Sequence, residues 1–178
     1  MLKITSIAQV ISIAMLSLTL ATQAGEAAKT LRPAFLLKTQ CANAGTGNWA
    51  QQMLNVSIGR QVYKSLFYMG PGDKFASLSC RIRPEASAPL FQTLHLGFGM
   101  RDIERSSPAN VVTIYLDGKP TISRTINPGQ PEVLSLDVIN ASNVGIETTC
   151  SNQSRACDRV YFFDASLERI PPSPTQKK

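Results

Sequence analysis

Few of the residues that carry enzyme chemistry occur in this sequence. It contains one histidine, His95, and it has no Gly-x-Ser-x-Gly elbow, no His-Glu-x-x-His motif and no phosphate-binding loop. These absences exclude the common serine hydrolases, zinc proteases and nucleotide-dependent enzymes. His95 alternates with Leu94 and Leu96, which predicts a position on the protein surface rather than a role as general base.

Two pairs of acidic residues are the remaining candidates for catalysis. Asp102 with Glu104, and Asp158 with Asp164, could flank a glycosidic bond as the two carboxylates of a glycosidase do. Nothing near either pair assigns the acid role to one carboxyl, so we interpret these residues as turn and edge carboxylates. The sequence therefore predicts a protein that is not an enzyme and uses no cofactor or metal. A small hydrolase is the least favoured alternative.

Long runs of charge are also missing. Lys and Arg number 18 against 12 Asp and Glu, which gives a net charge of +6, and the longest basic run is Lys177-Lys178. Charge that is spread in this way disfavours nucleic acid as a partner. Hydrophobic residues at 43% and charged residues at 17% indicate a chain that folds, and 178 residues suffice for one ordinary domain.

The first 24 residues have the pattern of a secretory signal peptide. Lys3 supplies a positive start, residues 4–20 are mostly apolar, and residues 22–24 are suited to cleavage after Ala24, with cuts after Ala27 or Ala28 as alternatives. A single membrane anchor is the other interpretation, but the apolar stretch is short and lacks a basic flank. We expect a secreted, periplasmic or cell-envelope protein that keeps no stable membrane span after cleavage.

All four cysteines follow the predicted signal peptide, and an even number in an exported chain favours disulfides. Three pairings are possible. Cys150 and Cys157 enclose a short polar run, which suggests a stapled loop and leaves Cys41 to pair with Cys80. A zinc site is the alternative, but the sequence has no closely spaced Cys pairs and His95 is its only imidazole.

Alternation of apolar and polar residues is the main secondary-structure signal. It occurs at residues 78–82, 94–98, 112–116, 134–138, 144–146 and 160–170. A period of two is typical of strands with one buried face, and turn residues such as Asp117-Gly118 separate these segments. Helical periodicity is weak throughout the predicted mature chain. The sequence predicts an all-β fold, an antiparallel β-sandwich or jelly roll.

Composition divides the chain into four parts. The signal peptide (1–24) precedes a mixed lead segment (25–48), and the compact domain is expected to start near Trp49 and to end at residue 170. Residues 171–178 are rich in proline and cannot build a core, which predicts a disordered tail.

Four segments together resemble the NPCBM family (novel putative carbohydrate-binding module). They are residues 56–63, which are similar to the family's early Ile-Gly-Gly segment, a strand ending in Asp-Gly at 111–119, the strands at 133–146, and a closing stretch at 158–167. In the closing stretch Asp158 matches the family, whereas Arg159, Tyr161 and Phe162 stand where the family tends to have His, Asp and Trp. The resemblance implies a galactose-binding-like β-sandwich that presents its ligand on loops at one end.

The resemblance implies a sugar-binding function, and sugar recognition needs an aromatic face for the pyranose ring and planar polar groups for its hydroxyls. The candidate sugar-binding residues are Trp49, Tyr63, Arg101, Asp158, Arg159 and Tyr161. We therefore predict an exported, non-catalytic module that binds a glycan or polysaccharide. The alternative is an envelope or secreted domain that keeps the fold, has lost the sugar site and binds a protein partner.

Overall fold

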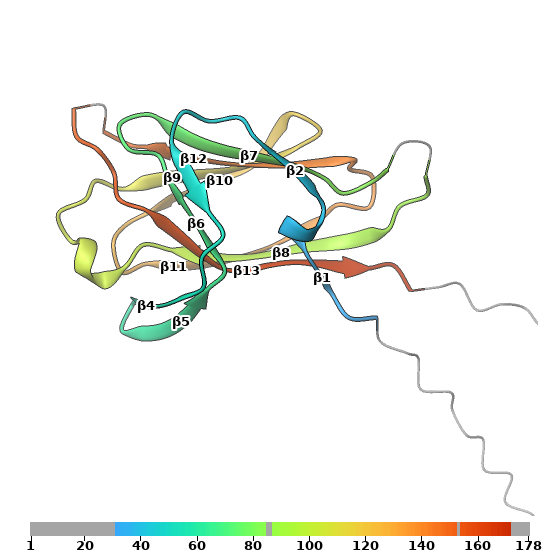
Figure 1. Ribbon diagram of the computed structural model, residues 1–178, viewed down its shortest axis with the longest axis horizontal. Coiled ribbons are helices and arrows are strands. Elements are labelled where there is room, and N and C mark those ends of the chain that lie inside the picture. The colour runs from blue at the N-terminus through green and yellow to red at the C-terminus, as the bar shows by residue number, and fades with distance from the viewer. Residues whose placement is uncertain (1–30, 85–86, 153, 172–178) are drawn as a thin grey trace, which may run out of the picture.

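The computed structural model describes residues 31–84, 87–152 and 154–171, and its secondary structure is almost entirely β (Figure 1). Within these residues there are 13 strands and two short 3-10 helices, η1 (Leu36–Lys38) and η2 (Asp102–Glu104). The expected signal peptide lies outside the described residues, as does the expected tail apart from residue 171. No described helix has the length and apolar character needed to cross a membrane.

The strands form two antiparallel sheets. Sheet A has six strands, five of which follow one another in the order β11 (Pro131–Asp137), β8 (Phe91–Gly99), β13 (Val160–Arg169), β6 (Phe67–Gly70) and β3 (Asn48–Ala50). The sixth, β1 (Ala34–Phe35), pairs with the second half of β13. Sheet B has the order β10 (Lys119–Ile126), β9 (Asn110–Leu116), β12 (Asn143–Cys150), β7 (Phe75–Arg81) and β2 (Gln40–Asn43). The predicted all-β fold with antiparallel sheets is confirmed.

The main core lies between the two sheets and follows the alternation seen in the sequence. Leu94, Leu96 and Phe98 of β8 are fully buried, and they face Val112 and Ile114 of β9 across the sandwich. His95, between two of these leucines, lies on the outer face with its side chain 36% exposed. Its predicted surface position is confirmed.

A β-bulge lets β13 bury residues of both parities. Val160 and Phe162 point into the main core in the first half of the strand, but Ala165 and Leu167 do so in the second half. The register against β8 shifts between Phe162 and Asp164, so the extra residue of the bulge moves the alternation by one position. Both halves of β13 therefore contribute apolar side chains to the same core.

A separate β-hairpin covers part of the outer face of sheet A. Its strands are β4 (Leu54–Ile58) and β5 (Gln61–Ser65), which pair only with each other in the described sheets. The hairpin buries a second cluster formed by Val56, Ile58 and Tyr161, with Tyr63 and Phe163 packed against it. The hairpin therefore excludes solvent from this part of the outer face of sheet A.

Gly97 is required where the hairpin meets sheet A. A Cβ at this position would lie 2.3 Å from the ring of Phe163, well inside contact distance. The missing side chain lets the Phe163 ring rest on β8 and stack on Tyr63, with ring centroids 4.2 Å apart. The hairpin thus packs against the sheet through aromatic rings rather than through backbone pairing.

One carboxylate ties the hairpin turn to the loop that contains η2. Asp102 accepts hydrogen bonds from the Ser57 hydroxyl (2.5 Å) and from the backbone N–H groups of Gly59 (2.8 Å) and Arg60 (3.0 Å). These bonds, the Ser57 bond above all, hold the pKa of Asp102 below its usual value. The interpretation of Asp102 as a turn carboxylate agrees with this arrangement.

We expect Asp102→Ala to loosen the hairpin while the sandwich stays folded, because the variant removes all three bonds at once. Hydrogen exchange should become faster at the amides of Gly59 and Arg60 and stay unchanged in β8. Because folding lowers the pKa of Asp102, its stabilising effect is complete above about pH 4 and is lost as pH falls through the folded-state value. Lowering the pH should therefore reduce the protection factors of the hairpin amides, which correct the exchange rates for their intrinsic pH dependence, in the wild type but not in Asp102→Ala. Equal responses of the two proteins would contradict the assignment.

Residues 34–43 belong to the segment that was expected to be a lead outside the compact domain, but they are part of the sandwich. β1 pairs with β13, β2 pairs with β7, and Leu36 between them is fully buried. The Cys41–Cys80 disulfide joins β2 to β7, and Cys150–Cys157 closes the short loop, so both expected disulfides are confirmed. The segment escaped prediction because β1 and η1 are too short to show a period.

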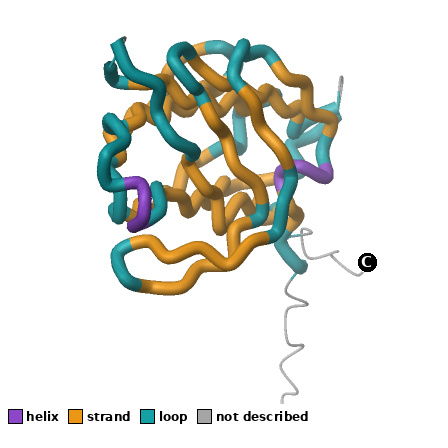
Figure 2. The backbone as a smooth tube through the Cα atoms, turned by 60° about the vertical axis from the view of Figure 1, so that its left-hand side comes forward, coloured by secondary structure: helices purple, strands orange, loops and turns teal. Residues whose placement is uncertain are grey.

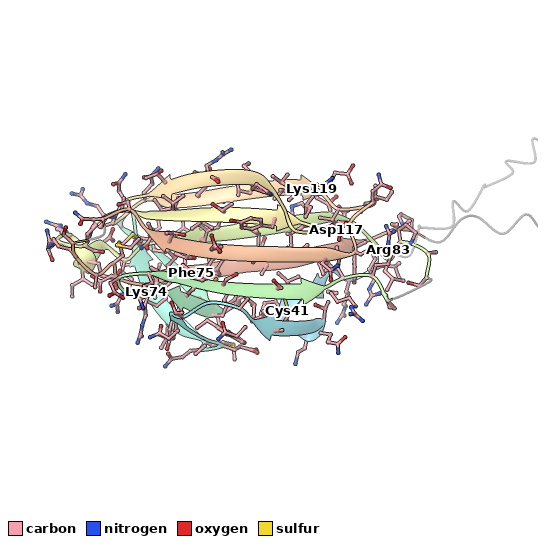
Figure 3. The ribbon with its side chains drawn as sticks, turned by 90° about the horizontal axis from the view of Figure 1, so that it is seen from above. Cys41, Lys74, Phe75, Arg83, Asp117 and Lys119 are labelled. Atoms are coloured by element: carbon pink, nitrogen blue, oxygen red, sulfur yellow. A yellow bond between two sulfur atoms is a disulfide. The ribbon has the colours of Figure 1, made fainter. Side chains whose placement is uncertain are left out.

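The two ends of the sandwich carry different groups of loops. At one end, which we call the loop end, the turn at 71–74 meets the Cys150–Cys157 loop, and the turn at 44–47 bonds to the start of β7. At the other, the terminal end, β1 begins and β13 finishes, beside residues 82–84 and the Asp117-Gly118 turn. Figure 2 shows strands filling the two layers with loops gathered at their ends, and Figure 3 places Lys74 at the loop end and Arg83 and Asp117 at the terminal end.

Candidate binding site

A polar pocket opens at the loop end of the sandwich. It has a volume of about 390 Å³ and is lined by three segments, residues 46–48, 70–73 and 157–159. The side chains of Asn48, Asp73, Asp158 and Arg159 are all exposed and belong to its lining. Amide, carboxylate and guanidinium groups therefore converge on one small volume, which provides hydrogen-bond donors and acceptors for a polar ligand.

Gly70 lines the pocket between two of its polar side chains. A Cβ there would lie 2.5 Å from Oδ1 of Asn48 and 3.3 Å from Cγ of Arg159, so these two side chains meet across the glycine. Asn48 is the ladder partner of Gly70, because β3 pairs with β6 at the edge of sheet A. The strand pairing brings residues from the two ends of the sequence to one place.

The Cys150–Cys157 loop positions Asp158. Cys157 forms an isolated bridge with Gly72, and its N–H donates to the Gly72 carbonyl at 2.7 Å. The backbone N–H of Asp158 donates to Ser107 Oγ (2.9 Å), and its carbonyl accepts from Asn110 Nδ2 (2.9 Å). With its backbone held on both sides, Asp158 is exposed to solvent and lines the pocket together with Asp73.

Arg159 is held by an aromatic ring. Its guanidinium carbon lies 4.1 Å from the ring centroid of Tyr68, which is a close cation–π contact. The guanidinium covers a face of the Tyr68 ring, and none of the pocket-lining residues is aromatic. The pocket therefore offers orientated polar groups but no open ring for stacking.

Tyr161 and Arg101 lie behind the pocket rather than in its wall. Tyr161 is 1% exposed beneath the hairpin, so its ring has no free face and Tyr161 leaves the set of candidate contacts. Arg101 Cζ lies 5.0 Å from the centroid of that ring, and its Nη2 pairs with Glu104 Oε1 at 2.6 Å. Burial raises the pKa of the Tyr161 hydroxyl, and the charges of Arg101 and Arg159 act against this.

Glu104 is also engaged in structure. It is 6% exposed, and burial raises the pKa of its carboxyl while the hydrogen bonds from Arg101 lower it. Asp102, in the same 3-10 helix, is bonded to the hairpin turn, so both members of one of the two candidate glycosidase pairs make structural contacts. In the part of the chain that the structure describes, no three His, Cys, Asp or Glu side chains are grouped so as to hold a metal ion.

The other two aromatic candidates are turned away from the pocket. Trp49 pairs with the fully buried Met69 and packs against the edge of the main core. Tyr63 stacks on Phe163 within the hairpin cluster. Of the six candidates, the structure thus brings Asp158 and Arg159 together in one pocket.

Sequence reasoning missed Asn48, Gly70 and Asp73. Each lies in or beside a glycine-containing turn, at 45–47 or 70–73, and such turns mark loops without saying which of them meet. Their convergence depends on the pairing of β3 with β6 and on the bridge between Gly72 and Cys157. These contacts link distant parts of the chain.

One further group of side chains resembles a hydrolytic triad but lacks its surroundings. His95 Nδ1 lies 2.8 Å from Ser135 Oγ, and His95 Nε2 lies 3.8 Å from Glu168 Oε2. The three residues lie on the outer faces of β11, β8 and β13. A hydrolase also needs donors for an oxyanion, whereas the backbone N–H groups of β8 point along the sheet toward its two neighbouring strands. The cluster fits a row of cross-strand polar contacts.

No protein-family model matches the sequence, and no curated protein is recognisably related to it. The fold, by contrast, is similar to that of solved carbohydrate-binding modules of the CBM51 type. The structure of CBM51-2 and INT domains from Clostridium perfringens ZmpB, in complex with GlcNAc, matches with a TM-score of 0.61 and 12% identity, over 78% of this chain and 32% of that one. The present chain thus spans about a third of that protein.

Two more CBM51 structures show the same likeness. CBM51 from Clostridium perfringens GH95, in complex with methyl-galactose, has a TM-score of 0.61 and 9% identity, over 76% of this chain and 99% of that one. The tandem CBM51 modules of Sp3GH98, a family 98 glycoside hydrolase from Streptococcus pneumoniae, match with a TM-score of 0.54 and 13% identity. The match covers 78% of this chain and 50% of that one. At these identities the likeness concerns the fold alone, an antiparallel β-sandwich.

Proposed function

We propose that this protein is an exported, non-catalytic module of the NPCBM type that binds carbohydrate in the polar pocket at the loop end. One observation carries the proposal: Asn48, Asp73, Asp158 and Arg159 converge at one end of a sandwich whose fold is that of carbohydrate-binding modules. Sugar hydroxyls both donate and accept hydrogen bonds. The carboxylates and amide oxygen would accept from them, and the guanidinium and amide nitrogen would donate to them.

The pocket suits a terminal sugar residue. Its volume of about 390 Å³ is at the small end of the range for ligand pockets, and it is open to solvent between loops. Without an open aromatic ring in the lining, affinity would come mainly from hydrogen bonds, which are weak in net terms. Two disulfides and an exported location fit together, because disulfides persist in oxidising compartments.

The test is an NMR titration with methyl-galactose and GlcNAc, followed by a glycan array. We expect saturable shifts at the amides of residues 46–48, 70–73 and 157–159. Asp158→Ala and Asp73→Ala should each weaken binding about tenfold or more, because each removes a charged hydrogen-bond acceptor. Gly70→Ala should also weaken it, since its Cβ displaces the Asn48 amide, a flexible group that can move at little cost in stability.

Asp137→Ala is the matched control. It removes the exposed carboxylate of the last residue of β11, which does not line the polar pocket, and it should leave sugar affinity unchanged. Equal weakening by Asp137→Ala would show that net charge rather than the pocket determines binding. If no glycan on the array binds, the proposal fails and the alternative stands, a secreted or envelope domain that binds a protein partner through the same fold. The pocket's lack of an aromatic ring is the observation that favours this alternative.

A further inference from the structure

A second pocket, of a different character, lies at the terminal end of the sandwich. Its volume is about 460 Å³, and its apolar wall is formed by Phe35, Ile82, Leu90 and Phe91. Leu90 is 42% exposed and lies in the same pocket as three other large apolar side chains, so the pocket presents apolar surface to solvent. The pocket shares no residue with the polar pocket at the loop end.

Three cationic side chains surround this apolar wall. Lys38, Arg81 and Arg169 all belong to the lining, and none of the described residues that line the pocket is acidic. Arg169 is held in place by Phe91, with its guanidinium carbon 5.4 Å from the ring centroid. An apolar surface that is ringed by positive charge complements a ligand with an apolar body and a negative group.

The walls of the pocket are well anchored. Lys38 ends the 3-10 helix η1, whose Leu36 is fully buried, and Arg81 ends β7 one residue after the Cys41–Cys80 disulfide. Phe91 starts β8 and is paired with Arg169 across the ladder of sheet A. The site is thus preformed, which lowers the entropic cost of binding a ligand.

We propose that this pocket binds a small organic carboxylate with an apolar chain, a medium-chain fatty acid or a molecule of the same chemistry. The chain would lie against Phe35, Leu90 and Phe91, and the carboxylate would accept hydrogen bonds from Arg169 and Lys38. The volume falls within the range of small-ligand pockets, and a cavity confined to one end of a small domain is much smaller than a protein interface.

The test is an NMR titration with hexanoate, octanoate and decanoate below their micelle concentrations, with 1-octanol as the neutral probe. Saturable shifts are expected at the amides of residues 34–40, 81–84, 90–91 and 169. Affinity should rise about fourfold for each added methylene, because each buried methylene contributes a similar increment. Octanoate should bind about tenfold more tightly than 1-octanol.

Variants test the charge and the location. Arg169→Gln and Lys38→Gln should each weaken octanoate binding about tenfold, while Arg124→Gln, which removes an exposed cation from β10 on sheet B, should not. Equal binding of 1-octanol, equal weakening by Arg124→Gln, or shifts outside the pocket would overturn the proposal. The proposal would also fail if the peptide Glu-Phe-Glu bound saturably and octanoate did not bind at all, because this result would indicate a peptide-docking site. The glycan array does not bear on this pocket, so either proposal can fail alone.

Discussion

Replacing Phe162 with alanine should cost about 3–5 kcal/mol of the free energy of unfolding. Phe162 is fully buried near the centre of the main core, and its ring centroid lies 4.4 Å from that of Phe67 and 5.4 Å from that of Phe98. The variant leaves a cavity that β-strands on both sides cannot close. Because domains of this size have only about 5–15 kcal/mol of stability in total, the loss should shift the urea midpoint strongly.

Phe163→Ala is the natural control, since it changes the next residue of the same strand. The Phe163 side chain lies on the outer face, where it stacks on Tyr63 in the smaller, half-buried hairpin cluster. We expect Phe163→Ala to lower the free energy of unfolding by about 1–2 kcal/mol, with the loss of stability concentrated in the hairpin. A larger cost for Phe163→Ala than for Phe162→Ala would mean that the core lies on the other side of β13.

Removing the Cys41–Cys80 disulfide should cost about 4 kcal/mol, against about 2 kcal/mol for Cys150–Cys157. The two bonds close loops of 39 and 7 residues in sequence separation, and the chain entropy that a disulfide removes from the unfolded state grows with the length of the loop. Double alanine variants of each pair, unfolded in urea, provide the measurement. The reverse order of costs would show that native-state packing outweighs loop entropy.

The same two variants should affect the two pockets differently. Cys157 lines the polar pocket and holds Asp158 beside Asp73, so removal of Cys150–Cys157 should weaken any sugar binding despite its smaller effect on stability. Cys41–Cys80 lies next to the apolar pocket, where it fixes β2 against β7. Weaker sugar binding in the variant that loses less stability would show that Cys150–Cys157 acts by positioning the polar pocket and not by holding the whole fold together.

Alternation predicted the strands that bury one full face. Residues 94–98 and 112–116 show it without interruption, and both strands lie in the interior of their sheets. The alternation did not predict β10, because β10 is an edge strand with one buried residue, Ile126, and carries almost no apolar pattern. The bulge at Phe163 was also invisible, since a run of aromatic residues at 161–163 gives no sign of which one is extra.

The site was harder to predict because side-chain direction depends on distant segments. Tyr161 would face solvent if the outer face of sheet A were bare, but the β4–β5 hairpin, a hundred residues earlier in the sequence, covers it. Asp158 and Arg159 were identified because they are polar side chains in the closing stretch that resembles the NPCBM family. Asn48 and Asp73 join them through strand pairing and a single bridge, which no local pattern encodes.

The position of β1 beside the end of β13 determines how the domain would respond to mechanical load. Ala34 pairs with Leu167, so a pull on the chain before β1 and after β13 would open their hydrogen bonds one after another, as a zipper opens, instead of shearing them together. Peeling would proceed through β1 and η1 and would stop at Cys41, where the disulfide passes the force directly to β7 in the opposite sheet. The covalent bond would act as a mechanical stop, and the polar pocket at the far end of the sandwich would keep its shape under tension that had already detached the first strand.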